Sequence, residues 1–176
     1  MNTSTTMKRL ATIAGSALIG LMIATGVYAE VEQVTAEVEF VTPVSIGENA
    51  SLRFGLLDVN LANLETIVIA PDNTVTDASG RVAGGTQGAA DLTITATGSQ
   101  GITISVGNPS VATGYTLGTW MCSYAGGTDT DCSSGYNQAS AGDGTATLLV
   151  GVTLTGNGSA ALGDDDSTFD VTVIYQ

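Results

Sequence analysis

The chain contains no histidine, and it has only four basic residues: Lys8, Arg9, Arg53 and Arg81. Without histidine, no serine–histidine or cysteine–histidine catalytic pair can form, and histidine metal sites are excluded as well. The one lysine lies in a leader that we expect to be removed, which excludes lysine-based covalent catalysis from the mature chain. Carboxylates remain, but no pattern selects the opposed pair that a glycosidase needs. We therefore expect a protein that is not an enzyme and that uses no cofactor.

Positive charge is scarce while negative charge is plentiful. Seventeen acidic residues give a net charge of −13 at pH 7. A surface of this sign repels nucleic acid and anionic lipid, so neither is an expected partner.

Residues 1–29 have the three regions of a secretory signal peptide. Lys8 and Arg9 form a basic start, residues 10–29 are uncharged and mostly apolar, and Val27-Tyr28-Ala29 is a suitable cleavage site. We expect cleavage after Ala29, export through the periplasm and membrane contact only through this leader. An uncleaved anchor is the alternative, because a segment of that length can just span a bilayer of about 30 Å.

The chain has two cysteines, Cys122 and Cys132. In an exported protein an even pair predicts one disulfide, here closing a short loop rich in Gly, Ser and Asp. Closing such a loop stabilises the fold by about 2.8 kcal/mol in the chain-entropy model. Free or intermolecular thiols are the alternative.

Apolar residues recur at every second position through much of residues 43–176. This period, bounded by Gly, Asn, Asp and Pro, predicts strands half-buried against a core, and no helical period follows Ala29. The clearest alternating or apolar runs are 52–56, 66–69, 90–96, 102–106, 115–119, 146–154 and 169–175. We predict an all-β domain over residues 43–176, an immunoglobulin-like β-sandwich, with a small closed barrel as the alternative.

Residues 30–42, called the leading segment below, form an amphipathic stretch before Pro43. Its apolar side chains share one parity, whereas Thr35, Glu37 and Glu39 have the other; the apolar set is Val34, Ala36, Val38 and Phe40. Fully extended, the segment reaches about 43 Å, beyond the edge of one small domain. It is either an ordinary first strand of its own sheet or a strand donated to another molecule.

The C-terminus also alternates, and its inward set is Phe169, Val171, Val173 and Tyr175. A strand of this kind exposes an unpaired edge unless something covers it. The ending resembles that of bacterial pilins assembled by the chaperone–usher route, which have a penultimate aromatic residue and a glycine fourteenth from the end, here Tyr175 and Gly163. The central position of the cysteine pair departs from many of those pilins.

That resemblance implies a fibre subunit of a Gram-negative-type bacterium. A periplasmic chaperone would bind the last strand, and an outer-membrane usher would then mediate assembly. The leading segment of one copy would complete the sandwich of the next copy, forming an extracellular filament by head-to-tail contacts.

The chain also resembles a family of secreted bacterial proteins known as a domain of unknown function. The matching motifs are Leu52-Arg53-Phe54-Gly55, Gly144-Thr145-Ala146-Thr147-Leu148, Val150-Gly151-Val152-Thr153-Leu154 and Val171-Thr172-Val173-Ile174-Tyr175. They occur in order across most of the expected domain, and the family implies no activity.

Two weaker features leave alternatives open. Tyr115, Trp120, Tyr124 and Tyr136 could line a glycan-binding face, which would make the protein a secreted surface-binding or adhesin domain that does not polymerise. Asp164, Asp165 and Asp166 are a weak candidate for a Ca²⁺ site, but the spacing favours a solvated turn, as it does for Asp129 and Asp131.

Overall fold

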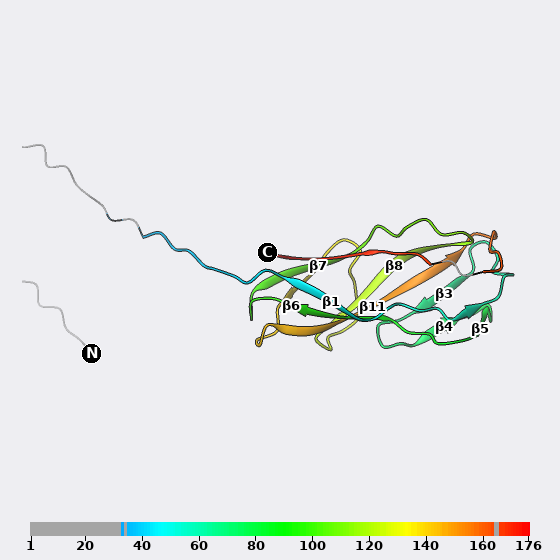
Figure 1. The fold of residues 1–176 in the computed structure, drawn as a ribbon, viewed down its shortest axis with the longest axis horizontal. Helices are drawn as coiled ribbons and strands as arrows, with labels where there is room; N and C mark the ends of the chain where they lie inside the picture. The colour runs from blue at the N-terminus through cyan, green and yellow to red at the C-terminus, as the bar shows by residue number, and fades with distance from the viewer. Residues whose placement is uncertain (1–32, 34, 164–165) are drawn as a thin grey trace, which may run out of the picture. The chain divides into compact units, whose positions relative to one another are not determined.

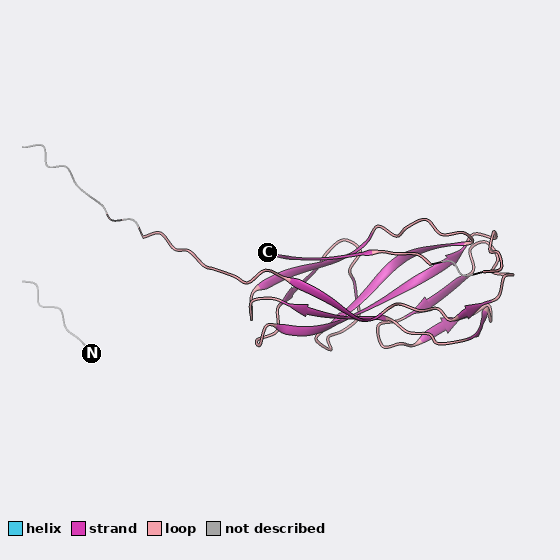
Figure 2. Cartoon of the chain, in the orientation of Figure 1, coloured by secondary structure: helices cyan, strands magenta, loops and turns pink. Residues whose placement is uncertain are grey.

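The computed structural model describes residues 33, 35–163 and 166–176, which form strands and loops (Figure 2). The predicted signal peptide, Val34, Asp164 and Asp165 lie outside these residues. Among the residues described, no helix is long and apolar enough to cross a membrane. The chain divides into two units, residues 1–38 and 39–176, and the strands belong to the second.

Seven strands form the larger sheet, which is centred on β11 (Thr145–Gly156). One edge of β11 pairs antiparallel with β6 (Ala90–Thr95) and β3 (Thr66–Ile69), and the other edge pairs with β8 (Tyr115–Tyr124). Three short strands extend the sheet from β6, β3 and β8, respectively: β1 (Ser45–Ala50), β4 (Val75–Asp77) and β9 (Thr130–Asp131).

The smaller sheet has the order β10-β7-β12, all antiparallel. Its strands are β7 (Gly101–Gly107), β10 (Tyr136–Ala139) and β12 (Asp170–Tyr175). Figure 1 shows the C-terminal strand lying beside β7. A separate two-stranded ladder joins β2 (Leu56–Leu57) to β5 (Val82–Gly84).

The main core lies between the two sheets and follows the period of two in the sequence. Each strand contributes alternate side chains, which is the pattern of a sandwich with polar outer faces. The fully buried large residues of this core include Ile94, Ile102, Ile104, Leu148, Val150 and Val152. A second, smaller core holds Leu61, Ile67 and Leu154. The predicted all-β sandwich is therefore confirmed, and the barrel alternative is not.

One long side of the sandwich is closed by the chain itself. Between β9 and β10, Cys132 donates its N–H to the Trp120 carbonyl of the larger sheet at 3.1 Å. Its own carbonyl accepts the N–H of Val106 in the smaller sheet, also at 3.1 Å. The predicted disulfide between Cys122 and Cys132 is confirmed, and both residues are fully buried. The bridge is therefore more than a clip on an exposed loop, because it fastens the corner where the chain changes sheets.

The described part of the leading segment, residue 33 and residues 35–42, is not a strand. Residues 35–44 lie outside every strand, and the first strand, β1, begins after Pro43. β1 was not apparent in the sequence because its six residues carry only one large apolar side chain, that of Ile46.

Candidate functional site

The opposite side of the sandwich is open. Within the described residues, β12 pairs only with β7 and β1 pairs only with β6, so each keeps one free edge. A groove of about 1120 Å³ lies between these edges, and its lining includes Ile46 and Glu48 of β1 and Phe169 and Val171 beside or within β12. We call it the open groove.

One wall of the open groove is a nearly continuous strand edge that begins in the larger sheet and continues into the ladder of β2 and β5. Residues 45–57 run antiparallel to residues 82–95 through β1, an isolated bridge between Arg53 and Gly88, and β2. The motif Leu52-Arg53-Phe54-Gly55 lies in this edge, where Leu52 and Phe54 turn inward and pack against the core. The floor includes Leu92, Leu117 and Leu154 from three neighbouring strands.

The side chains that flank the groove are incompletely buried. Ile102 and Ile104 of the central strand β7 are fully buried, whereas Val171 and Val173 of the edge strand β12 are only half-buried. All six residues of β1 are exposed. A free edge beside an unfilled apolar groove is the arrangement that accepts an additional strand or aggregates.

Seven of the ten exposed large apolar side chains of the described residues lie in two places, and the other three, Leu64, Val111 and Ile174, lie elsewhere. One set, on the groove lining, contains Ile46, Leu56, Val59 and Leu162. The other set, on the leading segment, contains Val38, Phe40 and Val41, with Phe40 being 91% exposed. Exposed apolar residues that cluster in this way mark interaction surfaces, while scattered ones need no explanation.

Three residues hold the chain where the leading segment ends. The Thr42 N–H donates to Oγ1 of Thr97 at 2.7 Å, and the Thr42 carbonyl accepts the Tyr175 hydroxyl at 2.6 Å. The Tyr175 oxygen in turn accepts the N–H of Thr97 at 2.6 Å. Nearby, Nε2 of Gln100 donates to Oε1 of Glu39 at 2.6 Å. These contacts join sequence positions that no local pattern links, so sequence reasoning missed them.

The exit of the leading segment and the open groove lie toward opposite ends of β12. Tyr175, the last residue of the strand, contacts Thr42, whereas Phe169, just before the strand, and Val171, near its start, line the groove. The segment thus leaves the domain at one end, and the groove opens toward the other.

The structure places the predicted C-terminal residues as follows. The side chains of Phe169, Val171, Val173 and Tyr175 are all half-buried and all pack against the main core. Phe169 also stacks against buried Trp120, with ring centroids 4.7 Å apart. Gly163 is not part of β12; it lies in an exposed loop that lines the open groove.

The aromatic residues do not form an exposed glycan-binding face. Trp120, Tyr124 and Tyr136 are buried in the main core, and Tyr115 is half-buried against the smaller one. Stacking on a sugar needs an accessible ring, so core packing explains these residues and their burial does not support the alternative of a glycan-binding face.

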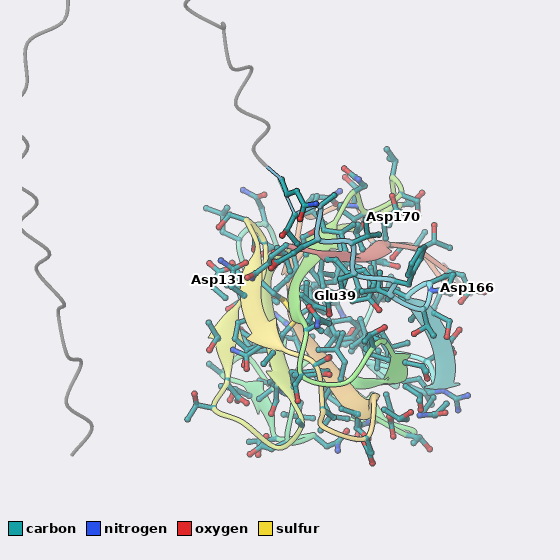
Figure 3. All side chains as sticks on the ribbon, turned by 90° about the vertical axis from the view of Figure 1, so that its left-hand side faces the viewer. Glu39, Asp131, Asp166 and Asp170 are labelled. Atoms are coloured by element: carbon teal, nitrogen blue, oxygen red, sulfur yellow. A yellow bond between two sulfur atoms is a disulfide. The ribbon has the colours of Figure 1, made fainter. Side chains whose placement is uncertain are left out.

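The acidic candidates are dispersed. In the view of Figure 3, Asp131 and Asp166 lie on opposite sides of the domain, with Glu39 between them. Among the described residues, no group of three or more metal-ligating side chains gathers. Asp131 accepts the N–H of Ser133 at 2.8 Å, and this bond and that to the Ser133 side chain lower the pKa of its carboxyl. Asp131, the last residue of β9, therefore stabilises the turn that follows the strand.

Comparison with known families gives one match. The profile described as a domain of unknown function, DUF4402, matches residues 44–175, which include every strand of the sandwich. The comparison with curated proteins gives no match, and neither does the comparison with solved structures.

Proposed function

We propose that the chain, which belongs to the DUF4402 family, is a structural subunit of an extracellular filament. Copies would join head to tail, each inserting its leading segment into the open groove of the next. The observation that carries the proposal is the open groove with a free edge on each side, in a chain whose own leading segment presents unpaired apolar side chains.

Insertion would satisfy both partners. The incoming backbone would lie between the two free edges and hydrogen-bond to β12 and to the edge of residues 45–57, and alternate side chains would enter the groove, as in other cases of strand addition. Burying Val34, Val38 and Phe40 would contribute about 1.5–3 kcal/mol each before the cost of ordering the segment. The half-buried residues Val171 and Leu52 would be covered at the same time.

The direction of joining follows from the opposite placement of exit and groove. A segment that leaves beside Tyr175 and enters a neighbour's groove near Phe169 makes a contact that does not close on itself. Repetition of a non-closing contact produces a linear array. A segment returning to its own groove would have to reverse direction at Thr42, which is held by Thr97 and Tyr175.

Before assembly, the free edge of β12 and the apolar groove need a temporary cover. Uncovered edges of this type pair with one another nonspecifically. A periplasmic chaperone would cover the edge and the groove. An outer-membrane usher would then mediate replacement of the chaperone by the leading segment of another copy. This part of the proposal is supported by the C-terminal resemblance to chaperone–usher pilins and by export through the predicted signal peptide.

The test compares two changes in the mature full chain that differ in parity. Replacing Val38 and Phe40 together by Ser should prevent assembly, because both belong to the inserted face. Replacing Val41 by Ser should leave assembly unchanged, because Val41 has the opposite parity. Negative-stain microscopy and sedimentation velocity would measure filament length and mass.

A second measurement follows groove occupancy directly. Trp120 is the only tryptophan and contacts Phe169 on the groove lining. A synthetic peptide of residues 30–42 should therefore change the fluorescence of the Val38→Ser, Phe40→Ser chain. Assembly of that double variant at the wild-type level would refute the proposal. A wild-type chain that stays monomeric yet binds unrelated apolar peptides would instead indicate a non-polymerising binding domain.

A further inference from the structure

Arg53 is a basic residue on the lining of the open groove. The described part of the chain contains one other basic residue, Arg81, and its guanidinium is already paired with Glu65 at 2.8 Å and lies 3.9 Å from Asp58. Arg53 makes no ion pair with any described residue and is exposed. The remaining charged groups of the lining are acidic: Glu48, Asp58 and Asp166. Arg53 is thus an isolated cation in an otherwise acidic groove.

The backbone of Arg53 is fixed although its side chain is free. Its N–H donates to the carbonyl of Gly88, and its carbonyl accepts the N–H of Gly88, both at 2.9 Å. Leu52 and Phe54 on either side turn inward to the core, so alternation directs Arg53 to the outer face of the edge. The cation is therefore presented at a defined position along the groove.

The leading segment carries the complementary charge with the matching parity. Glu37 and Glu39 alternate with Ala36, Val38 and Phe40. When the apolar set points into a groove, both carboxylates must lie on the outer face, which is the face of Arg53. Glu39 already accepts a hydrogen bond from Gln100 of its own domain at 2.6 Å, which leaves Glu37 as the freer partner.

We propose that Arg53 binds Glu37 of the incoming leading segment of a second copy and thereby sets the register of insertion. The inference rests on the proposed function, and it names the specificity contact of that same groove. With Glu37 opposite Arg53, Ala36 and Val38 lie beside Leu52 and Phe54, inside the groove. A slip by one residue would turn the apolar set outward and place Glu side chains in the core.

The pair matters because the rest of the encounter is repulsive. The chain has a net charge of −13, and the other charged side chains of the lining, Glu48, Asp58 and Asp166, repel an acidic segment. An opposite-charge pair across two strands changes affinity by about two- to fivefold, and placing like charges there has the opposite effect. The contribution should shrink as salt is added, since exposed charges are screened.

The test uses the full mature chain with Val38→Ser and Phe40→Ser, so that its own segment does not compete, and a fluorescent peptide of residues 30–42. Arg53→Gln should weaken peptide binding about two- to fivefold, and Arg53→Glu should weaken it further. Asn137 is an exposed residue of β10 and is not on the groove lining. Asn137→Asp changes the net charge by the same amount as Arg53→Gln and should leave peptide affinity unchanged. The difference in peptide affinity between wild type and Arg53→Gln should be smaller at about 500 mM salt, where screening is strong, than at about 50 mM salt, where it is weak.

Exchanging the charges identifies the partner residue. A Glu37→Lys peptide should recover binding to the Arg53→Glu chain, while a Glu39→Lys peptide should recover less. Peptide binding that is equally tight to wild type, Arg53→Gln and Arg53→Glu would overturn the role of Arg53 and leave the proposed function intact. Failure of the wild-type groove to bind the peptide at all would overturn the proposed function, and the Arg53 contact with it.

Discussion

The hydroxyl of Tyr175 donates a hydrogen bond of 2.6 Å to the carbonyl of Thr42, so the penultimate residue holds the base of the leading segment. The same oxygen accepts the N–H of Thr97. A resemblance to pilins drew attention to the tyrosine as a residue recognised by another protein. The structure adds a role within the subunit, because the two ends of the described domain are fastened together there.

Tyr175→Phe should loosen this junction without unfolding the domain. The ring still packs against the core, but the carbonyl of Thr42 and the N–H of Thr97 lose their partner. We expect hydrogen exchange of the Thr97 amide to accelerate by about fivefold, the effect of losing one ordinary hydrogen bond. Tyr115→Phe, which removes a hydroxyl bonded to Ser167, is the matched control and should leave Thr97 unchanged. Equal exchange in both variants would contradict the assignment.

Reduction of the disulfide should destabilise the closed side of the sandwich. Cys122 and Cys132 are ten positions apart, and their bridge should contribute about 2.8 kcal/mol to the free energy of unfolding. Urea unfolding with and without reductant measures this difference. A Cys122→Ala, Cys132→Ala chain should show no response to reductant. Unchanged stability of the wild type after confirmed reduction would disprove the prediction.

Gly151→Ala should be strongly destabilising. A Cβ atom at this buried position of β11 would clash with the carbonyl oxygen of Ile69 and would lie 2.8 Å from the nitrogen of Pro71. The clash is with backbone, so relief requires the turn after β3 to move, at a cost of about 1–3 kcal/mol or more. Gly118→Ala in neighbouring β8 meets nothing within 4 Å and should be tolerated. Thermal unfolding of the two variants compares them, and a Gly151→Ala chain as stable as Gly118→Ala would exclude this close approach.

The ion pair of Glu65 and Arg81 should appear in the acid dependence of stability. The Arg81 side chain lowers the pKa of Glu65 from 4.5 to about 2, with a further contribution from the N–H of Ala62. A pKa that is lower in the folded state gives stability that is complete above pH 4.5 and is lost as pH falls toward 2. The free energy of unfolding of the Glu65→Gln chain should therefore decrease less than that of the wild type as the pH falls from 4.5 toward about 2. An identical pH profile for both proteins, measured by urea unfolding, would show that the pair is not linked to folding.

The sequence predicted strands with one buried face better than it predicted the fully exposed strand β1. β6, β7, β11 and β12 were recognised because burial of one face imposes a period of two on their side chains. β1 escaped notice because its six residues are all exposed, so no period is imposed. The disulfide could be predicted from two cysteines in a chain that is expected to be exported, but its place at a sheet-to-sheet corner depends on tertiary contacts.

The candidate site was predictable only in part. The parity of the leading segment and of residues 169–175 was legible as alternation within single segments. The open groove was not, because Leu56, Leu117 and Leu162 meet only after the sheets form. Arg53 shows what the sequence can and cannot predict. The alternation of Leu52 and Phe54 predicts that Arg53 faces outward, whereas only the folded structure shows that Arg53 lies on the groove lining. The alternative of a glycan-binding face is not supported because residue type alone does not tell which face of a strand is buried, and the aromatic rings lie in or against the cores.

The placement of exit and groove at opposite ends of β12 makes any row of these subunits chemically unlike at its two tips. One tip would present an unpaired leading segment, which carries Glu37 and Glu39 beside its apolar residues. The other presents an unoccupied apolar slot, which cannot be left bare in water without inviting unwanted association. Growth and termination are therefore separate problems for such a fibre: a new copy suffices to extend it, but closing the slotted tip requires a molecule that offers a strand and has no slot of its own.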